Sequence, residues 1–416
     1  MNNDGGKHSP LGLTTPRLLG LGAGSLGLAT TWALYNTFMP LLLGQFISSS
    51  GWRGVVMGVD NVLALVLMPL IGAWSDRLDG PLGKRLPFLL VGMPLTGLLF
   101  AALPFAGTSL VALLSVDIAF LLAITVFRAP LVALMPDHVP NDRRSAANGI
   151  ITLMGAAGGA IGLLLLAPLF DQAVWMPFAV SGAIVLVSLV FVLLASDRHP
   201  HFVEKGAIQE EAPVVTGLVA DMKELLGRKR SAAGMLLLAV FAYFFGYSAL
   251  EAQFSTYATQ TLGLSGGGAG TAIGAASLAF MAMAVPAGRL TKRFASANVM
   301  RFGALLLALA ALVAASVEDP TSLPAILAVG GAGWALVLVP AYPLVVNQGG
   351  PSQIGFYTGM YYLFGSAASI AGPAVVGSLM DVFDNRALFI ALALSMVVGA
   401  ALVTLARRRK VEPGRA

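Results

Sequence analysis

The chain has 416 residues, of which 57% are hydrophobic and 11% are charged, and its mean hydropathy is +0.82. Soluble domains carry about 25% charged residues, so this composition excludes a chain that is mainly a soluble enzyme or a soluble nucleic-acid-binding domain. The absence of cysteine excludes a disulfide framework and a thiolate metal site, and the four histidines form no metal-binding pattern. The net charge of +5 has to be located along the chain before it can be interpreted.

Apolar runs of about 20 residues recur along the chain, and each is long enough to cross ~30 Å of hydrocarbon as a helix. A polar tail at 1–16 lacks the pattern of a cleaved signal, so we expect the first span to remain in the mature protein. The first six spans are expected at 17–46, 52–75, 86–106, 108–136, 146–170 and 173–195. After a polar linker at 196–231 and before a basic tail at 407–416, six more are expected at 232–258, 268–290, 297–316, 321–347, 353–380 and 385–406. The sequence therefore predicts an all-α membrane protein of twelve helices in two six-helix bundles, 17–195 and 232–406.

Basic residues lie almost entirely on one side of this predicted topology. The termini, the linker and the connections after spans 2, 4 and 8 hold 22 of the 25 Lys and Arg residues. The opposite side holds Arg53 and Arg386, while Arg128 lies within a span. Cytoplasmic segments carry such an excess, so we expect both termini and the linker on the cytoplasmic side of an inner or plasma membrane. The basic charge thus indicates topology and not nucleic-acid binding.

The two halves of the chain are related in sequence. A shift of 210 residues superposes Pro130 on Pro340, Asp137 on Asn347, Gly149 on Gly359, Gly155 on Gly365, Gly162 on Gly372, and Asp171 on Asp381. Small residues at such positions let membrane helices approach closely. Parallel repeats with substrate held between them near the bilayer midplane are a known transporter plan.

The loop after the second span reads GAWSDRLDGPLGKRLPF from Gly72. Together with RAPLVALMPDHVPNDRRSAANGI from Arg128 and GYSALEAQFSTYA from Gly246, it resembles the major facilitator superfamily. Within that superfamily, the closer resemblance is to the sucrose/proton symporters and the glycoside-pentoside-hexuronide cation symporters. The second half departs from the pattern, because PAGRLTKRF from Pro286 lacks the acidic residue of the first loop. The resemblance covers nearly the whole chain and implies alternating access by rocking of two bundles.

We interpret the loop from Gly72 as a conformational latch. Asp76 at the end of a span can cap a neighbouring helix and pair with a loop arginine, through charge-assisted hydrogen bonds worth ~1 to 3 kcal/mol. Such a contact would set the balance between two states without binding substrate, whereas solvated loop charges are the alternative. The expected latch residues are Gly72, Asp76, Arg77, Gly83, Lys84, Arg85, Asp137, Arg143 and Arg144.

Four ionisable residues lie inside the predicted spans: Asp60, Asp117, Arg128 and Glu251. Such a group costs ~2.5 to 3.5 kcal/mol or more in hydrocarbon, so it is rarely present without a role. Asp117 and Arg128 are eleven residues apart, which at roughly 100° per residue leaves them within about 20° of one helix face. We expect these four residues to carry proton coupling, with Asp117 as the first choice. A structural ion pair or a packing role is the alternative for each of them.

Aromatic and amide side chains supply the flat platforms and the hydrogen-bonding partners that sugar recognition needs. The expected substrate-binding residues are Trp32, Tyr35, Asn36, Asn61, Tyr243, Tyr247, Trp334, Tyr342 and Tyr361. Interfacial aromatic belts are the alternative for those near the ends of spans. This composition suits a sugar without identifying one.

The sequence therefore favours a secondary, proton-coupled symporter of a glycoside or related small polar solute. Sodium-coupled relatives of the melibiose type place two Asp residues one turn apart before the proline of span 2, whereas this chain reads ALVLM before Pro69, which favours protons. A proton-coupled exporter of amphipathic compounds and a non-transporting membrane receptor or scaffold are the alternatives. We expect no enzymatic activity, cofactor, metal or nucleic-acid partner, and we expect a monomer.

Overall fold

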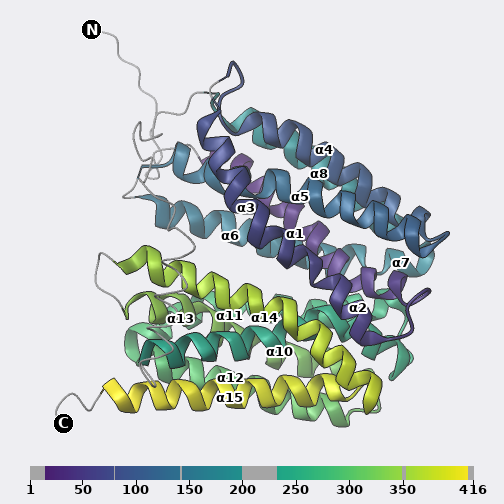
Figure 1. Ribbon diagram of the computed structural model, residues 1–416, viewed down its shortest axis with the longest axis vertical. Coiled ribbons are helices and arrows are strands. Elements are labelled where there is room, and N and C mark those ends of the chain that lie inside the picture. Colours follow the sequence, from purple (N-terminus) through teal and green to yellow (C-terminus); the bar gives the residue numbers. More distant parts are fainter. Residues whose placement is uncertain (1–14, 79, 141–142, 199–231, 349–352, 411–416) are drawn as a thin grey trace. The chain divides into compact units, whose positions relative to one another are not determined.

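The computed structural model describes residues 15–78, 80–140, 143–198, 232–348 and 353–410 (Figure 1). All the regular elements in these ranges are helices. Twelve helical stretches of the described chain are long and apolar enough to cross a membrane, which confirms the predicted all-α class and the number of spans. The tail at 1–14 and most of the predicted linker lie outside the described residues.

The helices follow the predicted spans in chain order. The first six spans contain α1 (Thr15–Leu43), α2 (Ser50–Met57), α3 (Val59–Arg77), α4 (Leu86–Ala102), η1 (Leu103–Ala106), α5 (Leu110–His138), α6 (Arg144–Ala160), η3 (Ile161–Leu166), α7 (Leu169–Gln172) and α8 (Met176–Ala195). The last six are α10 (Ala232–Gln260), α11 (Gly266–Arg293), α12 (Ser296–Ser316), α13 (Leu323–Val346), α14 (Ile354–Val382) and α15 (Ala387–Lys410). The last helix continues through the residues that we assigned to the start of the basic tail at 407–416.

Two of the predicted spans are interrupted. The second begins at the N-cap Ser49, whose side chain accepts a hydrogen bond from the Trp52 N–H, and it is divided at Gly58 into α2 and α3. In the fifth span, α6 passes into the π-helical turn η3, where the Ala167 N–H donates to the Gly162 carbonyl at 2.8 Å. Such a turn inserts a residue into the helical register, and π-turns are often found at functional sites.

The chain folds as two compact units. Unit 1 comprises Met1–Phe38 and Leu63–Lys205, and unit 2 comprises Met39–Val62 and Gly206–Ala416. The boundary at residue 205 falls within the predicted linker. However, the segment 39–62, which comes from the first half of the sequence, is grouped with the second half. Unit 2 therefore contains the end of α1, all of α2 and the first turn of α3.

Unit 1 is held together by close helix packing and an aromatic core. Within it, α4 packs against α5 and α8. The backbones of α4 and α8 approach so closely that a Cβ on Gly97 would lie 2.8 Å from the Gly182 carbonyl oxygen. The rings of Phe100 and Phe120, both fully buried, lie 5.2 Å apart in the same unit. Small residues at a membrane helix interface allow this close approach.

Unit 2 is organised around α10 and α13. The helix α13 packs against α11 and α12, while α10 packs against α14 and α15. The buried Tyr257 hydroxyl on α10 donates to the Ala314 carbonyl at the end of α12, at 3.1 Å. The short helix α2 packs against α14 and makes fewer contacts with α10. This unit therefore places residues of α2 and α3 beside those of α10.

Candidate transport and coupling sites

The aromatic wall of unit 2 is a chain of rings from α10, α13 and α14. Tyr247 stacks on Trp334, with ring centroids 3.9 Å apart and planes 8° apart. Phe244 meets Trp334 at 5.7 Å and Tyr361 at 6.1 Å, edge to face in both cases. Tyr342 packs edge-on against Tyr361 at 5.4 Å. Stacked and edge-to-face arrangements are those that aromatic rings prefer, so four of the predicted substrate-binding residues form one connected cluster. Trp334 and Tyr361 are buried within it, whereas Tyr247 is half-buried and Tyr342 is exposed.

Tyr243 is placed differently from the other predicted aromatic residues of α10. Its side chain is only 1% exposed, and its hydroxyl has no hydrogen-bond partner among the described residues. Its ring lies directly over Gly399 of α15, where any added Cβ would overlap it. The structure thus gives Tyr243 a place in the packing between α10 and α15.

Two predicted coupling carboxylates lie in unit 2. Glu251 follows Tyr247 by one turn of α10, and its side chain is exposed. Asp60, in the first turn of α3, is half-buried and accepts a hydrogen bond of 2.6 Å from the side chain of Asn61. Glu251 lies close enough to Asp60 for the two carboxylates to repel each other electrostatically. Unit 2 therefore contains Glu251 one turn from Tyr247 on α10, and the Asp60 and Asn61 pair within electrostatic range of Glu251.

The other two predicted coupling residues lie in unit 1, on α5. The guanidinium carbon of Arg128 lies 5.7 Å from the centroid of the Trp32 ring, within the range of a cation–π contact. Trp32 stacks on Tyr35 at 5.4 Å, and Asn36 is half-buried on the same helix. Asp117 is 1% exposed, whereas Arg128 is half-buried. Trp32, Tyr35 and Arg128 thus form one group, while the Asp117 carboxylate is enclosed in the interior.

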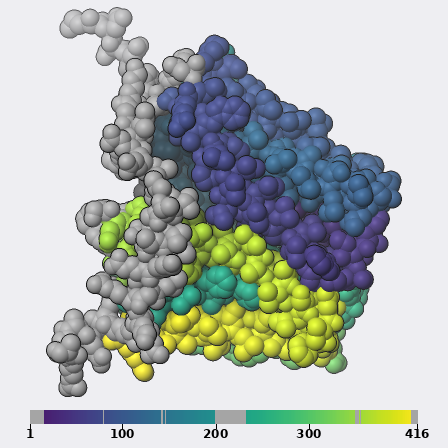
Figure 2. Space-filling view, in the orientation of Figure 1, coloured from purple at the N-terminus to yellow at the C-terminus, as the bar shows by residue number. Residues whose placement is uncertain are grey.

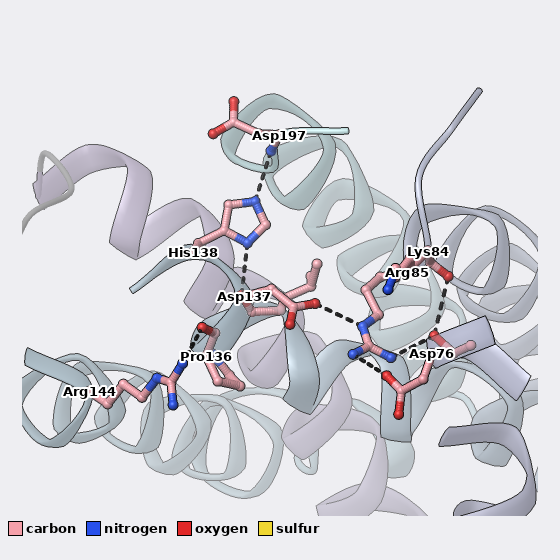
Figure 3. Close-up of polar contacts among 10 residues, drawn as sticks. Asp76, Lys84, Arg85, Pro136, Asp137, His138, Arg144 and Asp197 are labelled. Atoms are coloured by element: carbon pink, nitrogen blue, oxygen red, sulfur yellow. Dashed lines mark hydrogen bonds and ion pairs between the residues drawn. The ribbon is translucent and has the colours of Figure 1, made fainter. Parts of the chain in front are cut away.

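Arg85 is the centre of the predicted latch (Figure 3). Its Nη2 lies 2.5 Å from Asp76 Oδ1, its Nε donates to Asp137 Oδ2 at 2.8 Å, and its Nη1 donates to Ser75 Oγ at 2.9 Å. Burial lowers the pKa of Arg85, but the hydrogen bonds and charges of Asp137 and Asp76 outweigh it, so that this pKa is raised above its usual value. Arg85 therefore ties the end of α3 to the end of α5.

The other predicted latch residues contribute less directly. Lys84 takes part through its backbone, because its carbonyl accepts a hydrogen bond of 3.2 Å from Ser75 Oγ. Arg77 is exposed, and the space around Gly72 is open. The partner of Asp76 in the latch is therefore Arg85 rather than its sequence neighbour Arg77.

Arg144 braces the end of α5 from the first turn of α6. Its Nη2 donates to the Pro136 carbonyl at 3.0 Å, and its Nε donates to the Val139 carbonyl at 3.1 Å. Arg143 is the residue that immediately precedes α6. Both arginines therefore lie at the start of α6, where Arg144 contacts the end of α5.

Gly83 makes the tight turn of the latch loop possible. Its φ is 74°, and a Cβ at this position would overlap the Arg198 carbonyl oxygen. We expect Gly83→Ala to lower the free energy of unfolding by about 2 kcal/mol or more, because left-handed strain and a clash with backbone act together. Thermal denaturation of the purified protein in detergent measures this loss. Gly80→Ala is the matched control, since no atom lies within 4 Å of its Cβ position, and equal losses in both variants would contradict the prediction.

A second polar contact at this end of unit 1 was not predicted from the sequence (Figure 3). His138 is 3% exposed, with Nδ1 at 2.8 Å from the Leu134 carbonyl and Nε2 accepting from the Asp197 N–H at 2.9 Å. This arrangement fits a neutral imidazole that carries its proton on Nδ1. The Asp197 carboxylate pairs in turn with Arg17 at 2.7 Å. His138 lies in the sequence MPDHVP, but Asp197, which donates to it, lies about 60 residues further along the chain. The sequence therefore did not show this contact.

Known proteins resemble this chain in sequence and in fold. The sequence profile of the Major Facilitator Superfamily matches residues 21–266 and 236–416. The chain belongs to the major facilitator superfamily. Among the described residues, no three His, Asp or Glu side chains lie together as a metal site.

The related sequences include known transporters. Solute carrier family 45 member 3 of Mus musculus is 30% identical over 167 residues, which cover 37% of this chain and 30% of that protein. Sucrose transport protein SUC3 of Arabidopsis thaliana is 26% identical over 178 residues, which cover 38% and 30%. Proton-associated sugar transporter A of Homo sapiens is 32% identical over 65 residues, covering 16% and 9%. The matches thus span 30% or less of these relatives, and the predicted resemblance to sucrose transporters is confirmed.

Solved structures share the fold over almost the whole chain. A bacterial homologue of the human lysosomal transporter Spinster has a TM-score of 0.74 at 15% identity and covers 97% of this chain and 100% of its own. The nucleoside transporter NupG has a TM-score of 0.71 at 16% identity, with coverages of 94% and 99%. At these identities the likeness concerns the fold alone.

Proposed function

We propose that this superfamily member is a secondary active transporter that couples proton entry to the symport of a sugar, glycoside or related small polar solute. The observation that carries the proposal is the position of Glu251, one helical turn from the stacked Tyr247 and Trp334. A group that can bind a proton is thereby placed one turn from the half-buried Tyr247 ring, on which we propose that the solute packs. Transport of sucrose and of sugar with protons appears in the names of two relatives.

The proposed coupling element is the carboxyl pair Glu251 and Asp60. Carboxylates in membrane spans are costly unless they take up protons or find partners, so such positions commonly mark proton pathways. Two neighbouring carboxyl groups that interact bind and release their protons as a pair. The Asn61 amide donates to Asp60 at 2.6 Å, and Glu251 is the member of the pair that we propose to take up and release the proton.

The proposed solute wall is the aromatic chain that runs from Tyr247 to Tyr342. A sugar has apolar ring faces that pack on an aromatic ring, and hydroxyl groups that need donors and acceptors at the rim. The Tyr342 hydroxyl, which lies 3.1 Å from the Thr358 hydroxyl, supplies such a polar rim. In unit 1, Arg128 over Trp32 offers a second polar and aromatic set, with the half-buried Asn36 on the same helix as Trp32, whereas Tyr35 is fully buried.

The cycle that we propose is alternating access by rocking of the two halves, with the termini in the cytoplasm. The excess of Lys and Arg in the predicted cytoplasmic segments supports this orientation. The Arg85 latch, which ties α3 to α5, would then lie on the cytoplasmic side of unit 1.

Uptake into vesicles tests the function directly. Purified protein is reconstituted in liposomes, a panel of radiolabelled mono- and disaccharides is supplied outside, and a pH gradient is imposed with the interior alkaline. We expect accumulation of at least one sugar above its external concentration, and we expect a protonophore to abolish it. If a sodium gradient alone drove accumulation, the coupling ion would be sodium and not the proton. Efflux of amphipathic dyes without accumulation of any sugar would contradict the proposal in favour of an exporter.

A further inference from the structure

One carboxylate of α14 occupies the N-terminus of α2. Asp381 accepts a hydrogen bond from Ser49 Oγ at 2.6 Å, from the Ser50 N–H at 2.7 Å and from the Gly51 N–H at 3.0 Å. The first N–H groups of a helix have no partner within the helix, and its positive dipole end favours a negative charge. Asp381 therefore satisfies the start of a helix that lies more than 300 residues earlier in the sequence.

Two buried side chains, Gln253 of α10 and Arg53 of α2, make a second layer of polar contacts behind this cap. The side chain of Gln253 is fully buried, and its Nε2 donates to the Ser50 carbonyl at 2.8 Å and to the Pro373 carbonyl at 3.2 Å. Arg53, 2% exposed, donates to Ser50 Oγ at 2.8 Å and to Thr256 Oγ1 at 3.3 Å. We call Asp381, Gln253 and Arg53 the clasp, because together they bind α2 to both α14 and α10.

The backbones of α2 and α14 lie in direct contact beneath the clasp. A Cβ on Gly54 would overlap the Pro373 carbonyl, and one on Gly51 would lie 3.2 Å from Ser378 Cα. The space-filling view shows the purple surface around α2 adjoining the yellow-green surface of α14 (Figure 2). The two backbones are therefore in direct contact. The hydrogen bonds of Arg53 are buried beside them and only weakly screened, whereas the Asp381 carboxylate at the edge of this contact is exposed.

The clasp lies close along the chain to the proposed coupling pair, because Gln253 shares α10 with Glu251 and the helix of Arg53, α2, directly precedes the helix of Asp60, α3. Gln253 follows Glu251 by two residues on α10, and Asp60 lies in the first turn after α2 ends at Met57. A shift of α2 away from α10 would therefore move Asp60 away from Glu251.

We propose that Asp381, Gln253 and Arg53 are positioning residues that hold α2 closed against α10 and α14, and so keep Asp60 within reach of Glu251. The link to proton coupling rests on the proposed function, whereas the holding of α2 does not. The predicted topology places the start of α2 on the outer side of the membrane. Arg53 and Arg386 are the only basic residues that it places on that side. Release of the clasp thus accompanies exposure of the site to the outside.

The absence of cysteine from the chain makes this proposal directly measurable. Thr256 is fully buried under the Arg53 guanidinium, so Thr256→Cys provides a single thiol that a membrane-impermeant maleimide reaches only when α2 moves away. In right-side-out vesicles we expect Asp381→Asn to increase the external labelling rate of this thiol about tenfold, because the variant loses a charge-assisted cap. Gln253→Met removes two donors without changing a charge and should act in the same direction.

Asp384→Asn is the matched control. Asp384 is a carboxylate three residues beyond Asp381, and it accepts a hydrogen bond of 2.6 Å from the Arg386 N–H of its own loop. Its replacement should leave the labelling rate unchanged. Size-exclusion chromatography checks that all three variants elute as the parent does. Equal labelling rates in Asp381→Asn, Gln253→Met and Asp384→Asn would then overturn the clasp.

The two proposals fail in distinguishable ways. The labelling experiment needs no solute, so a protein that accumulates no sugar can still show the tenfold change in labelling rate. That result would support the clasp and contradict its link to proton coupling. If the parent accumulates sugar, Asp381→Asn should lower the accumulation ratio several-fold while exchange of labelled for unlabelled solute persists. A variant that labels faster but accumulates as the parent does would separate the clasp from the carboxyl pair.

Discussion

Vesicles that carry the Glu251→Gln variant are expected to lose uphill accumulation of solute and to retain solute exchange. Glutamine keeps the shape and the hydrogen-bonding atoms of the side chain but cannot bind and release a proton. Because one pH unit is worth about 1.4 kcal/mol, a gradient of two units sustains about hundredfold accumulation with one proton per solute. The ratio in the variant should fall to about one, since solute then moves without a proton. Counterflow of labelled solute into preloaded vesicles measures the retained exchange.

Glu318→Gln is the control for this experiment, because that side chain is 87% exposed in the loop before α13 and belongs to the same unit. It should accumulate solute as the parent does. Asp60→Asn should act in the same direction as Glu251→Gln if the two carboxyl groups work as a pair. Unchanged uphill accumulation in Glu251→Gln would remove this residue from coupling and make Asp117→Asn the next variant to measure.

Replacing Arg85 with methionine is expected to give the largest loss of stability in unit 1. The Arg85 side chain is 11% exposed, and its partner Asp137 is 13% exposed, so the replacement leaves a nearly buried carboxylate without its cation. Breaking such a pair costs about 3 kcal/mol. The pair with Asp76 adds less, because that carboxylate is 62% exposed and is screened by water. The midpoint of thermal denaturation in detergent reports the loss.

Arg77→Met provides the comparison for Arg85→Met, since Arg77 is an exposed arginine at the end of α3. Exposed substitutions usually change stability by less than about 0.5 kcal/mol. Combining Arg85→Met with Asp137→Asn should restore part of the stability, because no buried charge is then left unpaired. Equal losses in Arg77→Met and Arg85→Met would show that the latch depends on loop charge in general and not on the Arg85 contacts.

The number of spans could be predicted because each one is a long apolar run, and the length of a membrane-spanning helix is fixed by the bilayer. The interruptions could not. Membrane helices tolerate glycine within their spans, so Gly58 gave no sign that it would divide α2 from α3. The π-turn that closes on Gly162 likewise follows from tertiary packing, which local hydropathy does not record.

Helical spacing predicted which site residues share a face but not which residues meet. It placed Tyr247 and Glu251 one turn apart on α10, and the same reasoning favoured Asp117 with Arg128 on α5. In the structure Asp117 is enclosed, while Arg128 lies over Trp32 from another helix. The contact of Asp381 with α2 joins segments far apart in sequence, so no local pattern announces it. Arg85 and Asp137 were both expected in the latch, but only the fold shows that they pair directly.

Segment 39–62 has a consequence for how this chain can be divided. A cut in the linker leaves this segment with the N-terminal piece, although unit 2 requires it. The C-terminal piece alone would leave the Asp381 carboxylate and the buried Gln253 amide without the α2 groups that they bind. The sequence repeat and the folding unit therefore do not coincide. Although the two halves are related in sequence, we therefore expect the second half to need segment 39–62, so that split pieces behave as obligate partners.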